Sequence, residues 1–536
     1  MKSVMSHSFS QVPKAEIPRA SFNRSHGCKS TFDGGQLIPF FVDEALPGDT
    51  FNNKSAGFVR LSTPIYPIMD NMYMDTFFFA VPVRLVWDNF QKMMGEQKNP
   101  GDSTDFLVPQ MNSNSGHTEG SLPDYMGIPT KVPNLSYNAL HFRAYNLIYN
   151  EWFRDQNLQD ELVVQKDDGP DDPLNYQVKN RGKRHDYFTS ALPWPQKGDA
   201  VEIPITGNAP VVAAGALPTE MFKATIGGNS NVGVSIGSTT GGITPVNAEF
   251  SDALPGSTVD PQTYLEPNMF ADMDNVTSAT INQLRQAFQI QKMYERDARG
   301  GTRYTEVIKS HFGVTSPDAR LQRPEYLGGG STPINITPLA STTDIADVSG
   351  GSGRGLASLA AIGTASFNNH GFTKSFTEHT LLIGLVNVRA DLTYQQGLNR
   401  MFSRRDRLDF FWPALAQIGE QEILNKEIYA QGSQVTENGD DDVFGYQERY
   451  AEYRYKPSTI HGQFRSNSDT PLDAWHLSQQ FADLPTLSSN FITDQPPIDR
   501  VVAVPSEPQF IADFYHRLNC ARPMPLFGVP GNMDRF

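Results

Sequence analysis

The chain has 536 residues, of which 38% are hydrophobic and 19% are charged, and its formal net charge is −15. This length and composition exclude a mainly disordered chain and allow a substantial hydrophobic core. The acidity argues against general nucleic-acid binding as the main role, and the absence of a long apolar run in the sequence excludes a transmembrane helix.

The start of the chain is polar and basic. Residues 1–20 contain no apolar stretch typical of a secretory signal, and Cys28 and Cys520 are too few for a disulfide framework, so we expect assembly in a reducing cytoplasm. Residues 1–33 are predicted to form an N-terminal arm, in which Lys and Arg outnumber the single acidic residue that precedes Asp33. A frayed terminus and a functional basic arm fit this composition about equally well.

Residues 34–90 contain three predicted strands. They are Leu37–Val42, Thr50–Leu61 and Met72–Val83, and turn-forming residues separate them. Short β-rich runs of this kind indicate an antiparallel sandwich or barrel. The run Phe77–Val81 has no polar alternation, so we expect its strand to be covered on both faces.

Helical periodicity appears in several places. Asn138 is predicted to cap a helix with one apolar stripe, formed by Leu140, Ala144, Leu147, Ile148 and Trp152. Such a wide stripe is more often core or subunit contact than a cofactor site. Shorter helices are predicted at Leu85–Met94 and Tyr304–Phe312, and a longer one at residues 277–299, which Gly300 and Gly301 end.

Residues 166–185 change from acidic to basic. The acidic part contains Asp167, Asp168, Asp171 and Asp172, but it lacks the ligand spacing and the closing Glu of an EF-hand. We therefore interpret it as a solvated loop rather than a metal site.

Residues 199–272 differ in composition from the rest of the chain and are rich in Gly, Ala, Thr, Ser and Val. Alternating valines suggest short strands. A disordered linker is the alternative, but Met221, Phe222 and the valines are unusual in a pure linker. These residues therefore favour a structured segment over a disordered linker.

The second half of the chain mixes strand signals with long polar stretches. Strands are predicted at Thr332–Leu339 and Thr377–Leu392, whereas the region Gly328–His370 as a whole is interpreted as a Gly-, Ser- and Thr-rich excursion. The segment Gly445–Lys456 is ambiguous, because Tyr446, Tyr450 and Tyr453 fit helix spacing, whereas Tyr453 and Tyr455 fit a strand.

The segment Arg400–Pro413 combines basic and aromatic residues. Arg404, Arg405 and Arg407 could contact phosphates while neighbouring aromatic side chains stack on bases. A salt-bridged surface turn beside a packed aromatic strand is slightly favoured, because Asp406 and Asp409 supply local partners.

Catalytic motifs are missing from the sequence. It contains no phosphate-binding loop, no GxGxxG, no GxSxG and no HExxH motif, and we predict no enzyme activity, no cofactor and no metal site. A jelly-roll carbohydrate-binding protein or glycoside hydrolase remains an alternative, because motifs alone do not reveal converging carboxylates.

Several long segments resemble the major capsid protein of microviruses, small phages with circular single-stranded DNA, and especially its gokushovirus branch. They include IPFFVDEALPGDTF, TPIYPIMDNMYMDTFFFAVPVRLVWDNF, HFRAYNLIYNEWFRDQNLQ, RHDYFTSALPWPQKG and ARPMPLFGVPG. The resemblance implies a mainly β fold, an eight-stranded antiparallel jelly roll with long loop insertions and a few helices. Its two parts would be residues 34–198 and 273–536.

The resemblance also implies a function. The chain would be a structural capsid protein of the virion that assembles with itself, in the bacterial cytoplasm, into a T=1 icosahedral shell around circular single-stranded DNA. Further partners would be a small basic DNA-binding virion protein, a pilot protein and a host cell-surface receptor. Residues 199–272 would form a protrusion at the threefold axis that recognises the host.

Two sets of candidate residues follow from this resemblance. The candidate genome contacts are Lys14, Arg19, Arg24, Arg404, Arg405 and Arg407. The candidate host-recognition residues are Met221, Phe222, Val232, Val234 and Ile236.

Overall fold

The computed structural model describes residues 18–199, 201, 281–301, 303–314, 322–342, 357–432 and 439–527, together with the backbone of five short strands between residues 211 and 271. The chain divides into two compact units. The main unit contains residues 1–197 and 296–536, and the second unit contains residues 198–295. The predicted boundaries of the arm and of the insertion at 199–272 stay predictions, and most of the arm, residues 1–17, lies outside the described residues.

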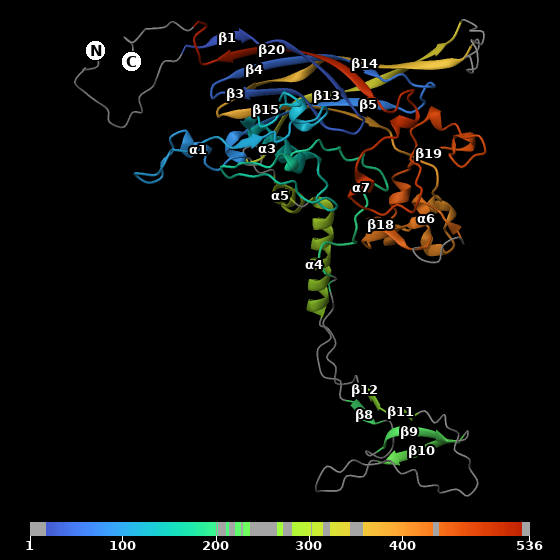
Figure 1. Cartoon of the computed structure of the whole chain (residues 1–536). Helices are drawn as coiled ribbons and strands as arrows, with labels where there is room; N and C mark the ends of the chain where they lie inside the picture. Colours follow the sequence, from blue (N-terminus) through green and yellow to red (C-terminus); the bar gives the residue numbers. More distant parts are fainter. Residues whose placement is uncertain are drawn as a thin grey trace. The chain divides into compact units, whose positions relative to one another are not determined.

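A large antiparallel sheet forms the main unit (Figure 1). Its strands are β1 (Ala20–Asn23), β2 (His26–Phe32), β3 (Ile38–Ala45), β4 (Thr50–Leu61), β5 (Met72–Pro82), β13 (Glu325–Ala340), β14 (Leu359–Ser375), β15 (Thr380–Ala390) and β20 (Phe510–Arg522). They follow the order β1-β20-β4-β14-β13-β5-β15-β3, and β2 also pairs with β20. The sheet curls into two layers, which we call the first layer (β1/β2, β20, β4, β14) and the second layer (β13, β5, β15, β3).

This arrangement is a jelly roll, as the family resemblance implies. The number of strands differs, because the main sheet contains nine strands where eight are expected. The strands β1 and β2 pair with successive parts of β20, so that Ala20 lies opposite Arg522 and Phe32 lies opposite Phe510.

The core lies between the two layers. Both layers contribute aromatic side chains to it, among them Phe51 and Phe514 from the first layer and Phe41 and Phe78 from the second. Along β5, Phe78 faces this core, whereas Phe79 belongs to a second cluster on the other side of the strand. The prediction that the run Phe77–Val81 is covered on both faces is therefore confirmed. Because both faces of the strand are buried, its sequence does not alternate between apolar and polar residues.

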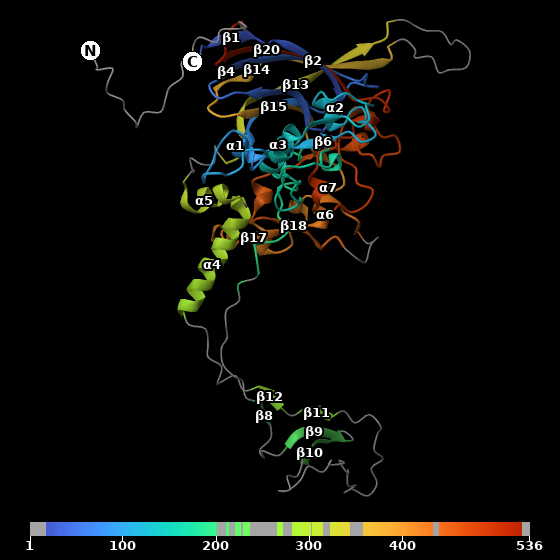
Figure 2. The same ribbon diagram turned by 60° about the vertical axis from the view of Figure 1, so that its left-hand side comes forward.

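Helices and loops cover the second layer. The helix α3 (Leu140–Ile148) continues as a π-helix at Tyr149–Phe153 and packs its apolar side against β5 and β15. The N-cap of this helix is Ala139, one residue after the predicted Asn138, and Asn138 accepts a hydrogen bond from the backbone N–H of Leu140 at 2.8 Å. Figures 1 and 2 both show α1 (Phe90–Met93) and α3 on the side of the second layer.

Long loops of the main unit build a third hydrophobic cluster. It includes α6 (Asn425–Ile428), α7 (Ser489–Ile492) and the hairpin of β17 (Glu420–Leu424) and β18 (Val443–Glu448). The ambiguous segment Gly445–Lys456 starts as the end of β18 and then forms a 3-10 turn at Ala451–Tyr453. Among the described residues, the remaining α-helices and strands of the main unit are α2 (Leu122–Tyr125), α5 (Tyr304–Phe312), β6 (Gln110–Asn112), β7 (Ser136–Asn138), β16 (Thr393–Tyr394) and β19 (Ser458–Thr459).

The expected excursion at Gly328–His370 is wrong in large part, because β13 and β14 occupy most of its described residues. Two of its described glycines are required by close packing within the sheet. A side chain at Gly329 would collide with the backbone carbonyl oxygen of Thr76, and one at Gly328 with that of Gly371. Glycine here allows backbones to approach closely rather than marking a turn.

The helix α4 (Ile281–Gly300) begins in the second unit, and Gly301, with a φ of +90°, follows its last residue. This confirms the predicted helix and its stop. The second unit also contains a three-stranded sheet and a strand pair, made of β9 (Glu220–Ile226), β10 (Asn229–Ser235), β11 (Leu265–Pro267), β8 (Val211–Ala213) and β12 (Met269–Ala271). No helix in the described part of the chain has both the length and the apolarity to cross a membrane.

Candidate functional site

The first predicted genome contacts lie at the start of β1 and just after it. Lys14 lies outside the described residues. Arg19 is exposed and donates to the hydroxyl of Thr50 at 3.1 Å. Arg24 forms an ion pair with Asp43 at 2.6 Å, so its charge is already neutralised within the chain.

The other three predicted contacts lie in a succession of 3-10 turns between Arg400 and Leu415. Arg404 pairs with Glu452 at 3.4 Å, and its guanidinium lies 4.3 Å from the ring centroid of Tyr453. Arg407 lies over the ring of Trp412, and Arg405 is exposed. The salt-bridged turn therefore describes Arg404 well, whereas Arg405 and Arg407 remain open to solvent.

The packed aromatic strand expected beside this turn is wrong. The residues after Arg407 form no strand, and their apolar side chains are exposed. Phe402 is 70% exposed and Leu408 is 61% exposed. We call this region the apolar surface, and it comprises Met401, Phe402, Leu408, Phe410, Phe411 and Trp412. Contiguous exposed apolar side chains of this kind mark interaction sites.

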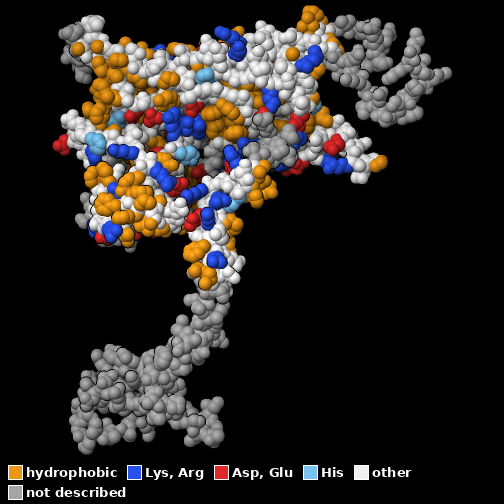
Figure 3. Space-filling model, turned by 180° about the vertical axis from the view of Figure 1, so that it is seen from behind, with side chains coloured by type: hydrophobic (Ala, Val, Ile, Leu, Met, Phe, Trp, Pro, Cys, Tyr) orange, Lys and Arg blue, Asp and Glu red, His pale blue; other side chains and the backbone are white. Residues whose placement is uncertain are grey.

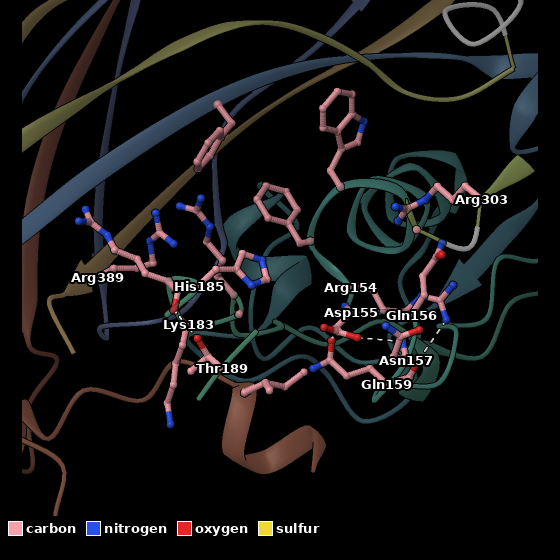
Figure 4. Close-up of a pocket in the computed structure, with 18 of the residues that line it drawn as sticks. Arg154, Asp155, Gln156, Asn157, Gln159, Lys183, His185, Thr189, Arg303 and Arg389 are labelled. Carbon is pink, nitrogen blue, oxygen red and sulfur yellow. Dashed lines mark hydrogen bonds between the residues drawn. The ribbon is translucent and has the colours of Figure 1, made fainter. Parts of the chain in front are cut away.

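A cationic pocket of about 750 Å³ lies beside the second layer, within the main unit. Figure 4 shows Lys183, His185 and Arg389 on one side of it and the segment 154–159 on the other. Its basic lining residues are Arg154, Arg181, Lys183, Arg184, Arg303 and Arg389, and aromatic rings from Phe77, Phe79, Trp152, Phe153 and Tyr326 complete the wall.

Carboxylates neutralise most of these cations. Arg181 and Arg389 share the carboxylate of Asp75, at 2.7 and 2.9 Å. Arg184 pairs with Asp391 at 3.0 Å. Burial lowers the pKa of Arg181 to about 10, and Arg389 adds to this effect. On the face shown in Figure 3, Lys and Arg side chains likewise gather with acidic and hydrophobic ones rather than forming a uniform cationic patch.

The carboxylates of the pocket are not arranged for catalysis. Asp155 accepts hydrogen bonds from the backbone N–H groups of Asn157 and Leu158, and Glu306 pairs with Arg303 at 3.0 Å. Both carboxylates are thus committed to local structure, which gives the hydrolase alternative no support. Among the residues that the structure describes, no three His, Cys, Asp or Glu side chains gather as they would around a metal ion.

The acidic tract at 166–185 contains a buried ion pair that the sequence analysis missed. Asp171 is fully buried and receives two hydrogen bonds from Arg143 of α3, at 2.8 and 2.5 Å. Tyr176 donates to the same carboxylate at 2.6 Å, and burial, together with this bond, raises the pKa of Tyr176. The interpretation as a solvated loop is therefore wrong for Asp171. The helical period offers one signal, because Arg143 lies in the same turn as the apolar Leu140 and Ala144.

The candidate host-recognition residues belong to the second unit. Met221 and Phe222 are in β9, and Val232 and Val234 are in β10, where Val234 pairs with Phe222 along the backbone. Ile236 lies outside the described residues. Their recognition role remains a prediction.

Comparisons with known proteins agree with the jelly roll. Residues 10–532 match the family model described as Capsid protein (F protein). Capsid protein VP1 of Bdellovibrio phage phiMH2K is 50% identical, with 99% of this chain and 98% of that protein covered. The VP1 capsid proteins of Chlamydia phage 1 and Spiroplasma virus 4 are 43% and 36% identical, and each comparison covers at least 97% of both chains.

Proposed function

The chain belongs to the capsid protein (F protein) family of microviruses and is a structural protein rather than an enzyme, and from this premise we propose that it forms a T=1 icosahedral shell around circular single-stranded DNA. The observation that supports this most is the end-to-end similarity to VP1 capsid proteins, which covers 99% of the chain. The similarity therefore extends over nearly the whole length of the chain and of these relatives.

Self-assembly is the physical basis of this function. The main unit closes its own hydrophobic clusters and still exposes the apolar surface around Phe402 and Leu408. Specific interfaces between copies bury roughly 1,200–2,000 Å², and many modest contacts stabilise a shell when symmetry closes it. The apolar surface is our candidate for one such contact.

The net charge of −15 limits how the subunit can meet DNA. Exposed basic side chains such as Arg405 and Arg407 are proposed to reach phosphates locally, and a small basic DNA-binding virion protein would supply further positive charge. We also propose a pilot protein and a host receptor as partners, with assembly in the bacterial cytoplasm. The insertion at 199–272 would recognise the receptor.

Electron microscopy of the purified full chain tests the proposal. We expect closed particles of uniform diameter, and particles made in infected cells should protect single-stranded DNA from nuclease. A chain that stays monomeric at all concentrations, or shells that never contain DNA, would contradict it.

Substitutions in the apolar surface test the assembly contact. The double variant Phe402→Ser and Leu408→Ser should fold normally, because both side chains are exposed in the single chain. We expect it to need at least tenfold more protein to form particles, measured by light scattering, since each large apolar side chain contributes about 1.5–3 kcal/mol when buried. Leu174→Ser is a matched control at another exposed site. Equal assembly of double variant and control would remove the apolar surface from the list of interfaces.

A further inference from the structure

The first layer of the sheet has one open face. Along β20, Phe510, Phe514 and Leu518 point into the core, whereas the alternate residues are exposed, as expected for a strand with one covered face. In Figures 1 and 2 no labelled helix lies over β1, β20 and β4, in contrast to the second layer.

The register places the exposed side chains of three strands next to one another. Arg517 of β20 lies opposite Lys54 of β4, and Ile511 lies opposite Arg60. Along its other edge β20 pairs with β2, where Lys29 lies opposite Asp513. The open face therefore carries four basic side chains, from Lys29, Lys54, Arg60 and Arg517, and one acidic one, from Asp513.

These four basic side chains differ from most arginines of the main unit. Within the described part of the chain, none of them forms an ion pair or a side-chain hydrogen bond, whereas Arg24, Arg143, Arg181 and many others are paired with carboxylates. An excess of unpaired positive charge on one face is unexpected in a chain with a net charge of −15. It indicates an anionic partner.

Aromatic side chains lie among these cations. Phe58 of β4 is 51% exposed and Tyr515 of β20 is 48% exposed, and Phe58 lies opposite Asp513 in the register. A groove of about 760 Å³ runs beside them, and its lining includes Lys29, Phe58 and Arg60 together with the carboxylates of Glu119, Asp124 and Asp513.

We propose that this open face binds the single-stranded DNA genome, with phosphates on the four basic side chains and bases stacked on Phe58 and Tyr515. The proposal rests on the proposed function and gives it a specific inner surface. Cations that track a backbone, with interleaved aromatic rings, form the usual platform for single strands. A neighbouring protein would instead have to desolvate several like charges at once, which is costly without matching carboxylates.

Binding of a labelled oligo(dT) to the full chain tests this directly. The triple variant Lys54→Gln, Arg60→Gln, Arg517→Gln should weaken binding and lower the slope of log K against log salt by about 2, since each phosphate contact to a single strand contributes about 0.7. The variant Phe58→Ala, Tyr515→Ala should weaken binding at least about tenfold through lost stacking while the salt slope stays the same.

A charge-matched control separates a specific face from general charge. The variant Lys98→Gln, Lys309→Gln, Lys456→Gln removes the same charge from exposed positions outside the first layer. We expect its salt slope to match that of the wild-type chain. If both triple variants behave alike, or if the first retains the wild-type slope, the open face is not the binding surface. Circular dichroism on every variant verifies that the fold is retained.

Particles distinguish failure of this inference from failure of the proposed function. If the wild-type chain forms no DNA-containing shells, the proposed function is wrong, and the oligonucleotide result still decides what the open face binds. We expect the first triple variant to form shells with less DNA. If instead shells are lost while oligonucleotide binding is unchanged, the open face is an interface between copies, and the DNA proposal is overturned.

Discussion

A single buried histidine illustrates how the core constrains chemistry at the residue scale. His516 of β20 is fully buried, and its ring nitrogens lie 2.7 Å from the hydroxyl of Ser55 and 3.0 Å from the carbonyl oxygen of Phe40. The carbonyl can only accept, so Nε2 carries the hydrogen and Nδ1 accepts from Ser55. Burial lowers the pKa of His516 to about 4.

This lowered pKa predicts a loss of stability in acid. The neutral ring is favoured in the folded chain. The contribution of His516 to the free energy of unfolding is therefore complete above the unfolded pKa of about 6.5, and it is lost as the pH falls towards 4. We expect the free energy of unfolding to fall by about 3 kcal/mol over this window because of His516. In His516→Gln, which cannot titrate, this part of the pH dependence should disappear.

Denaturant unfolding of unassembled chain, run on both proteins at pH 7 and at pH 4.5, measures this effect. The stability advantage of the wild-type chain should be larger at pH 7. An equal difference at both pH values would show that His516 does not titrate in the folded core.

At the scale of elements, a buried ion pair joins α3 to the loop that follows it. Arg143 of α3 also donates to the backbone carbonyl oxygens of Val86 and Asp167, at 3.1 and 2.9 Å. The guanidinium of Arg143 thus holds together Asp171, the acidic loop and the end of the turn that follows β5. Such a cluster fixes where the covering layer sits on the sheet.

Removing one partner of this pair should be costly. Asp171→Asn leaves the buried charge of Arg143 without its carboxylate, and we expect a loss of about 3–5 kcal/mol in the free energy of unfolding. Denaturant unfolding measures it, with Asp160→Asn, an exposed position in the same loop region, as the matched control. A change below 1 kcal/mol would mean that solvent reaches the pair.

At the scale of the whole molecule, the described part of the main unit builds its own hydrophobic clusters. Among the described residues, the buried members of these clusters lie before residue 197 or after residue 333. A deletion of residues 205–260 therefore removes none of these described cluster residues.

Deletion of residues 205–260 tests the proposed division of roles. We expect the shortened chain to form particles with a yield similar to that of the full chain, because every described residue of the three hydrophobic clusters is retained. Attachment of these particles to the bacterial host should be lost, since the proposed recognition residues are removed. Particle yield by electron microscopy and attachment by cell sedimentation measure the two outcomes. Loss of particles would assign the segment to assembly instead.

Features that depend on neighbours in the chain could be predicted from the sequence. The limits of β4 match the predicted Thr50–Leu61, and Gly300 and Gly301 end α4 as expected. Alternation, helical period and the conformational preference of glycine act over a few residues, so a short window of sequence contains them. The jelly roll itself came from family resemblance, and the structure confirms it.

Features that depend on register required the tertiary structure. Only the pairing of β20 with β4 brings Arg517 beside Lys54, and only the packing of α3 brings Arg143 to Asp171. The need for glycine in β13 likewise arises from a neighbouring strand that lies more than two hundred residues away in the chain. Local periodicity says which way each side chain points, whereas the energy of a charge depends on which distant groups the fold places beside it.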